Sequence, residues 1–190
     1  MCCATKRLVQ IQCPADCVYL TAARDHPSAA AIRQQQRDAE LLVHCMRDLS
    51  ERQSQLFFVI STFLQKYEPA ELQPIIDDDV ADAAAALAGT FETAVRGVIY
   101  EHRPAAPPAD RLATALKPVL AEAGKHAGSA FDRDAAVVLR RVEAAARELK
   151  AADPSNRRAY LDVLSRVLSA PQDSAGGQGE PPSQPRLIVP

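Results

Sequence analysis

The cysteine pair Cys13 and Cys17 is the part of the sequence whose residue types and spacing suggest chemistry most directly. Pro14 follows the first cysteine, and proline is favoured at the first position of a helix, so both sulfur atoms are expected on one face of a helix N-terminus. The partial positive charge at that end lowers the pKa of a thiol and favours the thiolate, which binds metals and attacks disulfides. The pair therefore predicts a metal or redox site.

A zinc site needs four ligands, so this pair alone does not complete one. Cys2 and Cys3 lie within reach, because about ten residues of extended chain span more than the distance required. His102 is a further candidate ligand, at the expected end of a long helix. We predict a metal bound by Cys13 and Cys17, with zinc first and an iron–sulfur cluster second.

Two other interpretations of the cysteine pair stay open. Small buried cysteines that pack a helix against its neighbours would explain both residues without chemistry. A dithiol redox enzyme would use Cys13 and Cys17 as working groups and His102 as a ligand or acid–base partner, although C-x-x-C is the more efficient redox spacing. Cys45 is expected in the core rather than at a metal.

Composition narrows the class of protein. The 190 residues carry 22 Lys and Arg against 24 Asp and Glu, a formal net charge of −2, which argues against a nucleic-acid partner. No apolar run approaches the roughly 20 residues that cross a bilayer, so we expect no membrane insertion and no signal peptide. An odd cysteine count concentrated in the first quarter suits a reducing compartment, and a cytoplasmic location follows. The sequence contains no Gly-x-Ser-x-Gly motif and no glycine-rich phosphate loop, so it supports no specific enzyme class.

The hydrophobic pattern predicts an all-α protein, a bundle of six or seven helices. Residues 1–27 are expected to form a short extended arm and a short cysteine-bearing helix. Residues 28–170 are expected to form the bundle. Residues 171–190 are rich in Gly, Pro, Ser and Gln, which predicts a disordered tail.

Capping residues predict where several helices begin. Ser28 and Ser50 each precede a helical pattern, and Gln53 completes a capping box with Ser50. The acidic run at 77–79 predicts the start of an amphipathic helix that continues to about His102.

Later helices are predicted to begin at the caps Asp132 and Ser155, and Pro118 predicts a kink or break within another helix. In the helix after Ser28, the residues expected to face inward are Ile32, Leu41, Leu42 and Cys45.

Two features of the sequence could indicate binding partners, a basic patch and the apolar end of the tail. The arginines at 133, 140, 141 and 147 form a basic patch, and interleaved acidic residues predict a solvated, salt-bridged face. The tail ends in Arg186, Leu187, Ile188, Val189 and Pro190, which would dock on an unidentified protein partner by strand addition or pocket insertion. The alternative is an unstructured terminus with a chance apolar end. We therefore predict a non-catalytic accessory or interaction protein whose metal site anchors the N-terminal arm.

Overall fold

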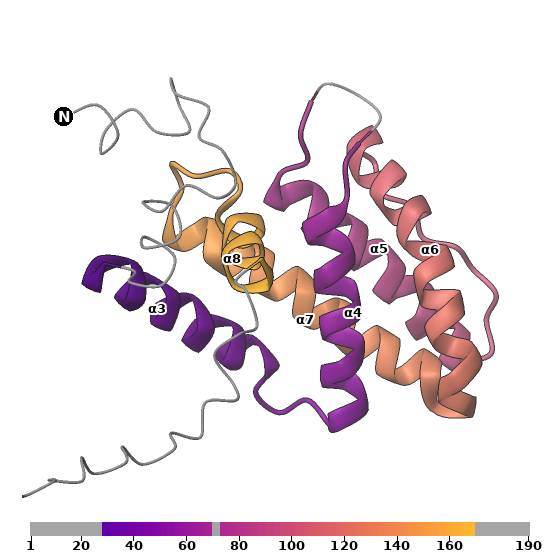
Figure 1. Ribbon diagram of the computed structural model, residues 1–190. Coiled ribbons are helices and arrows are strands. Elements are labelled where there is room, and N and C mark those ends of the chain that lie inside the picture. The colour runs from indigo at the N-terminus through magenta and orange to yellow at the C-terminus, as the bar shows by residue number, and fades with distance from the viewer. Residues whose placement is uncertain (1–27, 70–72, 170–190) are drawn as a thin grey trace, which may run out of the picture.

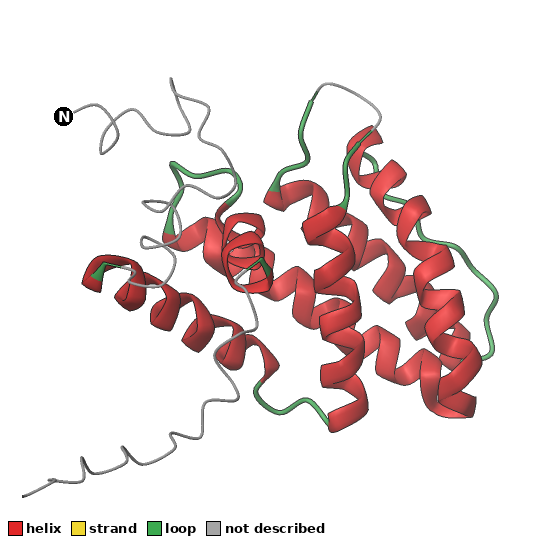
Figure 2. Cartoon of the chain, viewed as in Figure 1, coloured by secondary structure: helices red, strands yellow, loops and turns green. Residues whose placement is uncertain are grey.

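The computed structural model describes residues 28–69 and 73–169 (Figure 1). Within these ranges the chain folds as six α-helices and one 3₁₀ turn, with no strand (Figure 2). None of these helices is long and apolar enough to cross a bilayer. The expected arm, cysteine-bearing helix and tail lie outside the described residues. The elements are α3 Ala29–Met46, α4 Glu51–Lys66, α5 Asp77–Val95, α6 Pro107–Ala127, η1 Gly128–Ala130, α7 Phe131–Ala152 and α8 Ala159–Leu168.

α5 and α7 form the centre of the bundle and contact each other more extensively than any other pair of helices. Small buried side chains, Ala84 and Ala88 on α5 and Ala145 and Ala146 on α7, allow the two backbones to lie close together. α6 packs on α5, whereas α4 and α8 pack on α7 and on each other. α3 lies at one end of the bundle, against α8 and α7 (Figure 1).

The first two predicted caps are confirmed. The Ser28 side chain accepts a hydrogen bond from the backbone N–H of Ala31, at 3.2 Å, where α3 begins. Ser50 and Gln53 form both bonds of the capping box before α4, because each side chain accepts from the other residue's N–H. These local signals are readable from sequence because both partners lie within one turn.

The predicted end of α5 at His102 is wrong, because this helix ends at Val95. Gly97 adopts a φ of +77°, a left-handed conformation that favours glycine. The N–H of Gly97 donates to the carbonyl of Ala94, and the N–H of Val98 donates to that of Thr93, which is the Schellman pattern that closes a helix. The chain beyond Val98 therefore leaves the helix and runs as a loop that includes His102.

Three further expectations need correction. α6 continues through Pro118 without a break, because this proline is exposed and the bond that it lacks lies on the solvent side of the helix. α7 begins at Phe131, directly after η1, so Asp132 lies in its first turn rather than at its cap. Leu42 and Cys45 are buried as expected, but Ile32 and Leu41 are exposed because only one side of α3 contacts the bundle.

The last helix begins at Ala159 rather than after Ser155, and Asp77 caps it from another part of the chain. The carboxylate of Asp77 accepts from the N–H of Tyr160 at 3.0 Å and from that of Leu161 at 3.3 Å. The N–H of Asp77 donates in return to the carbonyl of Arg157. Asp77 is 1% exposed, so this buried carboxylate ties the start of α5 to the start of α8.

A second buried carboxylate holds α3 on α8. Asp38 is 1% exposed and accepts from Arg166 through Nε at 2.5 Å and Nη2 at 3.1 Å. Gln34 donates to the same carboxylate from one turn earlier, at 2.8 Å. The pairing gives the peripheral helix a specific attachment in addition to the apolar contacts of Leu42 and Cys45.

Replacing Asp77 tests the cap between α5 and α8. Asp77→Ala leaves two buried N–H groups without an acceptor, so we expect the free energy of unfolding to fall by about 1–3 kcal/mol. Asp77→Asn keeps one side-chain acceptor and should lose less. Urea denaturation followed by circular dichroism measures both changes, and equal losses in the two variants would contradict the capping role.

The same residue gives a pH prediction. Burial raises the pKa of Asp77 more than its two backbone hydrogen bonds lower it. The Asp77 carboxyl therefore holds its proton more tightly in the folded state than in the unfolded state. This proton's contribution to the free energy of unfolding is lost as the pH rises through the folded-state pKa. Plotted against pH, the unfolding free energy of the wild type minus that of Asp77→Asn should fall with rising pH; a rising difference would refute the assignment.

Candidate functional site

Only one residue of the predicted metal site lies in the described part of the chain. Cys2, Cys3, Cys13 and Cys17 precede it, and the docking segment from Arg186 to Pro190 follows it. The predictions for these residues remain predictions. His102 is described, and its surroundings can be examined directly.

His102 lies in the loop between α5 and α6 and is fixed against α5. Its backbone N–H donates to Oγ1 of Thr90 at 2.9 Å. Its imidazole ring meets the ring of Tyr100 edge-on, with ring centroids 4.7 Å apart. The imidazole lies over Gly89, where an added Cβ would be only 3.1 Å from Cδ2 of the ring. The absence of a side chain on Gly89 therefore makes room for this histidine.

The imidazole of His102 has one unused nitrogen, because Nε2 is buried and has no hydrogen-bond partner among the described residues. Within residues 28–69 and 73–169, no three His, Cys, Asp or Glu side chains gather where they could hold a metal ion. His102 thus presents an unpartnered ring nitrogen, and a complete set of metal ligands beside it would need residues from outside these ranges.

The loop that carries His102 also closes an apolar corner pocket of about 650 Å³ between α5 and α6. Leu87, Phe91, Leu120 and Phe131 contribute to its walls. Glu101 pairs with Lys117 of α6 and so attaches the loop across the pocket. The volume lies within the range of about 300–1,000 Å³ that small-ligand sites occupy.

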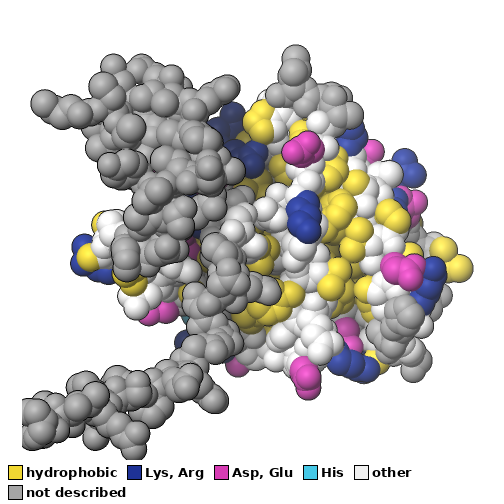
Figure 3. All heavy atoms as spheres, viewed as in Figure 1, with side chains coloured by type: hydrophobic (Ala, Val, Ile, Leu, Met, Phe, Trp, Pro, Cys, Tyr) yellow, Lys and Arg dark blue, Asp and Glu magenta, His cyan; other side chains and the backbone are white. Residues whose placement is uncertain are grey.

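A further apolar area lies over α4, where hydrophobic side chains gather toward α6 (Figure 3). Phe58 and Val59 are exposed there. A shallow pocket of about 230 Å³ adjoins Val59 and includes Arg52 and Asp134, which pair at 2.9 Å. The charges of Arg52 and Asp134 balance each other, so this pocket offers no net charge for attracting a charged partner.

A groove between α5 and α7 with a volume of about 520 Å³, which we call the arginine groove, is lined by several arginines. Four arginines and one glutamate give it a formal charge of +3, although the whole chain carries −2. Apolar side chains from both helices form its floor. Its residues are Glu92, Val95, Arg96, Arg133, Ala136, Val137, Arg140, Arg141 and Ala144.

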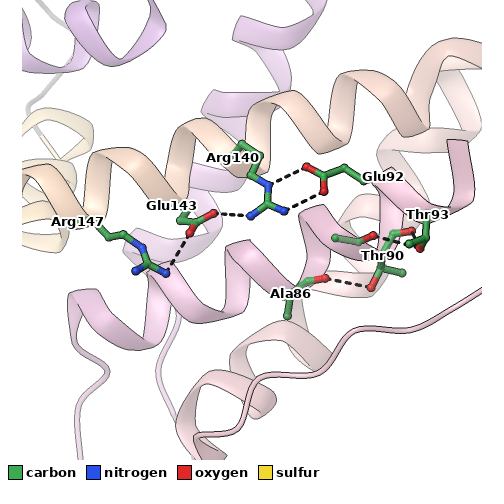
Figure 4. A network of polar contacts seen from close by, with 8 residues as sticks. Ala86, Thr90, Glu92, Thr93, Arg140, Glu143 and Arg147 are labelled. Atoms are coloured by element: carbon green, nitrogen blue, oxygen red, sulfur yellow. Dashed lines mark hydrogen bonds and ion pairs between the residues drawn. The ribbon is translucent and has the colours of Figure 1, made fainter. Parts of the chain in front are cut away.

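Arg140 connects the two walls of the arginine groove (Figure 4). Its guanidinium binds Glu92 of α5 through Nε at 2.7 Å and Nη2 at 2.9 Å, and Glu143 through Nη1 at 2.9 Å. Glu143 also pairs with Arg147, at 3.0 Å. The hydrogen bonds from Arg140 lower the pKa of Glu92, and the two carboxylates raise the pKa of Arg140, so the pair stays ionised around neutral pH.

The other arginines of the groove retain more of their binding capacity. Arg96 and Arg133 are exposed, and neither makes a side-chain hydrogen bond or ion pair with any residue that the structure describes. Arg141 donates through Nη2 to the carbonyl of Arg47 at 3.2 Å. Three guanidinium groups of the groove thus make no hydrogen bond or ion pair to a carboxylate of the described chain.

A comparison of the chain with protein-family models, curated proteins and solved structures finds no match. The candidate sites therefore rest on their own geometry.

Sequence reasoning identified part of the arginine groove, and the solvated, salt-bridged face that it predicted is confirmed for most of α7. The expected salt-bridged face is present at Arg140 and Arg147, but Arg133 lacks an acidic partner within the described residues. Arg96 and Val95 belong to the same groove and were missed, because they lie on another helix about 40 residues away. The available signal was the α7 pattern of Arg133, Val137, Arg140, Arg141 and Ala144, which is a single helix face.

The close contact between Gly89 and His102 gives a stability prediction. In the wild type, Gly89→Ala forces the ring to move, so the gain in helix propensity of about 1 kcal/mol should be largely cancelled. In a His102→Ala background the obstruction is gone, and Gly89→Ala should stabilise the protein. Unfolding free energies of the four proteins form a double-mutant cycle, and purely additive effects would contradict the contact.

Proposed function

We propose that this protein is a non-catalytic interaction protein whose helical bundle holds an acidic partner protein in the arginine groove. The observation that carries the proposal is the concentration of four arginines around an apolar floor in a chain of net negative charge. Charge complementarity steers association and selects among partners, whereas burial of apolar groups contributes affinity. A groove that offers both is suited to a protein partner.

The proposal retains a metal site that would anchor the N-terminal arm to the bundle. Cys13 and Cys17, with Cys2, Cys3 or His102 completing the ligands, would bind zinc and anchor the N-terminal arm. The buried, unpartnered Nε2 of His102 supports this ligand. An iron–sulfur cluster is the second choice of metal group. The alternative function is a metal-dependent or dithiol redox enzyme that uses Cys13 and Cys17.

The C-terminal segment from Arg186 to Pro190 would provide a second contact with the partner. α8 is integrated in the core, with Tyr160, Leu161 and Leu164 buried. In this proposal the segment that follows α8 serves recognition, by strand addition or pocket insertion. Cytoplasmic residence, as the clustered cysteines suggest, completes the proposal.

Metal analysis tests the cysteine site. Protein purified without chelator should contain about one zinc per chain, and a Cys13→Ser, Cys17→Ser variant should lose both the metal and the stability that metal binding contributes. Cys45→Ala is the matched control, because this thiol lies in the core, and it should keep the metal. If the protein contains iron and shows visible charge-transfer bands, the site holds an iron–sulfur cluster instead of zinc. Metal-free wild-type protein would refute the site.

Two changes test the interaction function. Arg96→Glu with Arg133→Glu reverses two exposed charges in the arginine groove, whereas Arg33→Glu with Arg157→Glu makes the same change at exposed arginines outside it. From cells that express the protein naturally, we expect the wild type and the control to retain one acidic protein that the groove variant releases.

The retained protein is then identified by mass spectrometry, purified and titrated against all three chains, so that direct binding decides the question. Deleting residues 171–190 should weaken retention while the thermal unfolding of the bundle stays unchanged. A partner whose binding depends on neither the groove nor the tail would overturn the proposed function.

A further inference from the structure

The arginines of the arginine groove lie in two groups along its length. α5 ends beside the start of α7, so Arg96 and Arg133 lie at the same end of the groove. Arg140 and Arg141 stand two turns further along α7, about 10 Å away at a rise of 1.5 Å per residue. Arg141 carries the unbalanced charge of this group because Arg140 pairs with Glu92 and Glu143. Positive charge is therefore concentrated at two positions rather than spread evenly.

Apolar side chains lie between and beside these charges. Val95 is 45% exposed and Val137 is 42% exposed, and Ala136 and Ala144 extend the same floor. β-Branched side chains at such positions remain in contact with water unless another molecule covers them. An occupant that matches the groove must present apolar atoms to the floor and negative charge at both ends.

We infer that the occupant is an amphipathic α-helix of the acidic partner, with carboxylates seven residues apart and apolar side chains between and beyond them; this inference rests on the proposed function. The groove face of α7 from Arg133 to Ala144 is about 16 Å long, which equals three turns of helix. A helix laid alongside has the same rise per residue, so acidic residues at i and i+7 reach the two arginine groups. Apolar residues at i+4 and i+11 then cover the floor.

The floor also distinguishes this occupant from others. A nucleic-acid strand would satisfy the arginines with phosphates, but it would leave Val95 and Val137 without apolar contacts. A small anion would neutralise one end only. The helical occupant satisfies both the charge separation and the exposed valines, as recognition of helices in grooves generally requires.

Synthetic peptides test the inference. A 15-residue capped peptide of Ala and Gln carries Glu at positions 3 and 10 and Leu at positions 7 and 14. The control peptide has the same composition, with Glu at positions 5 and 12, which places the carboxylates on the opposite face of the helix. Fluorescence anisotropy at low salt should give a Kd at least tenfold lower for the first peptide.

Variants of the full chain locate the binding. Arg96→Glu with Arg133→Glu should weaken binding of the first peptide at least tenfold, and Arg33→Glu with Arg157→Glu should leave it unchanged. Circular dichroism must show the same unfolding curve for both variants, as expected for arginines without bonds to other described side chains. Raising the salt concentration should also weaken binding of the first peptide to the wild-type chain.

Each contrary outcome has a defined meaning. Equal groove-dependent binding of both peptides would overturn the helical register and leave an acidic partner in place. Loss of all groove-dependent binding to acidic peptides would overturn the proposed function as well. If a single-stranded oligonucleotide binds the groove more tightly than the peptide, the occupant is nucleic acid. If the protein self-associates and the groove variant does not, the occupant is a second copy of the chain.

Discussion

The close packing of α5 against α7 is the constraint on which the rest of the structure depends. Alanines such as Ala84 and Ala145 are buried where the two helices meet, so the backbones approach closely and the pair forms an extended seam. Larger side chains, including Leu139 and Val142, fill the space toward the neighbouring helices. α6, α4 and α8 then cover the remaining faces of this pair. The arginine groove, whose walls are α5 and α7, therefore lies along the most extensive helix contact of the described chain.

Charged pairs along the same seam set the register of the two helices. Asp78 pairs with Lys150 near one end, and Glu92 pairs with Arg140 near the other, as two antiparallel helices require. Each is substantially exposed, so each contributes no more than about 1 kcal/mol to stability. They nevertheless favour the observed register, since a slip by one turn would separate both Asp78 from Lys150 and Glu92 from Arg140. Buried alanines allow close approach in several registers, and the ion pairs distinguish among them.

The sequence predicted the local signals well and the long-range signals poorly. The capping box of Ser50 was predictable because both of its partners lie within four residues. The end of α5 was missed because Val98 continues the apolar period, and the left-handed turn at Gly97 had no distinctive neighbour in the sequence. The start of α8 was missed because its cap, Asp77, lies more than 80 residues upstream. The arginine groove was only half recognised for the same reason, since tertiary packing brings its two walls together.

The double role of Arg140 explains why the groove keeps free charge. Arg140 supports the seam through Glu92 and Glu143, so its charge is already balanced within the fold. An acidic residue added beside Arg96 or Arg133 would neutralise the groove just as simply, and α5 offers an exposed position for it at Val95. That position instead holds a valine that is nearly half exposed. In the proposed complex, an apolar partner surface between flanking carboxylates would cover this valine, which a polar residue at the same position would not allow.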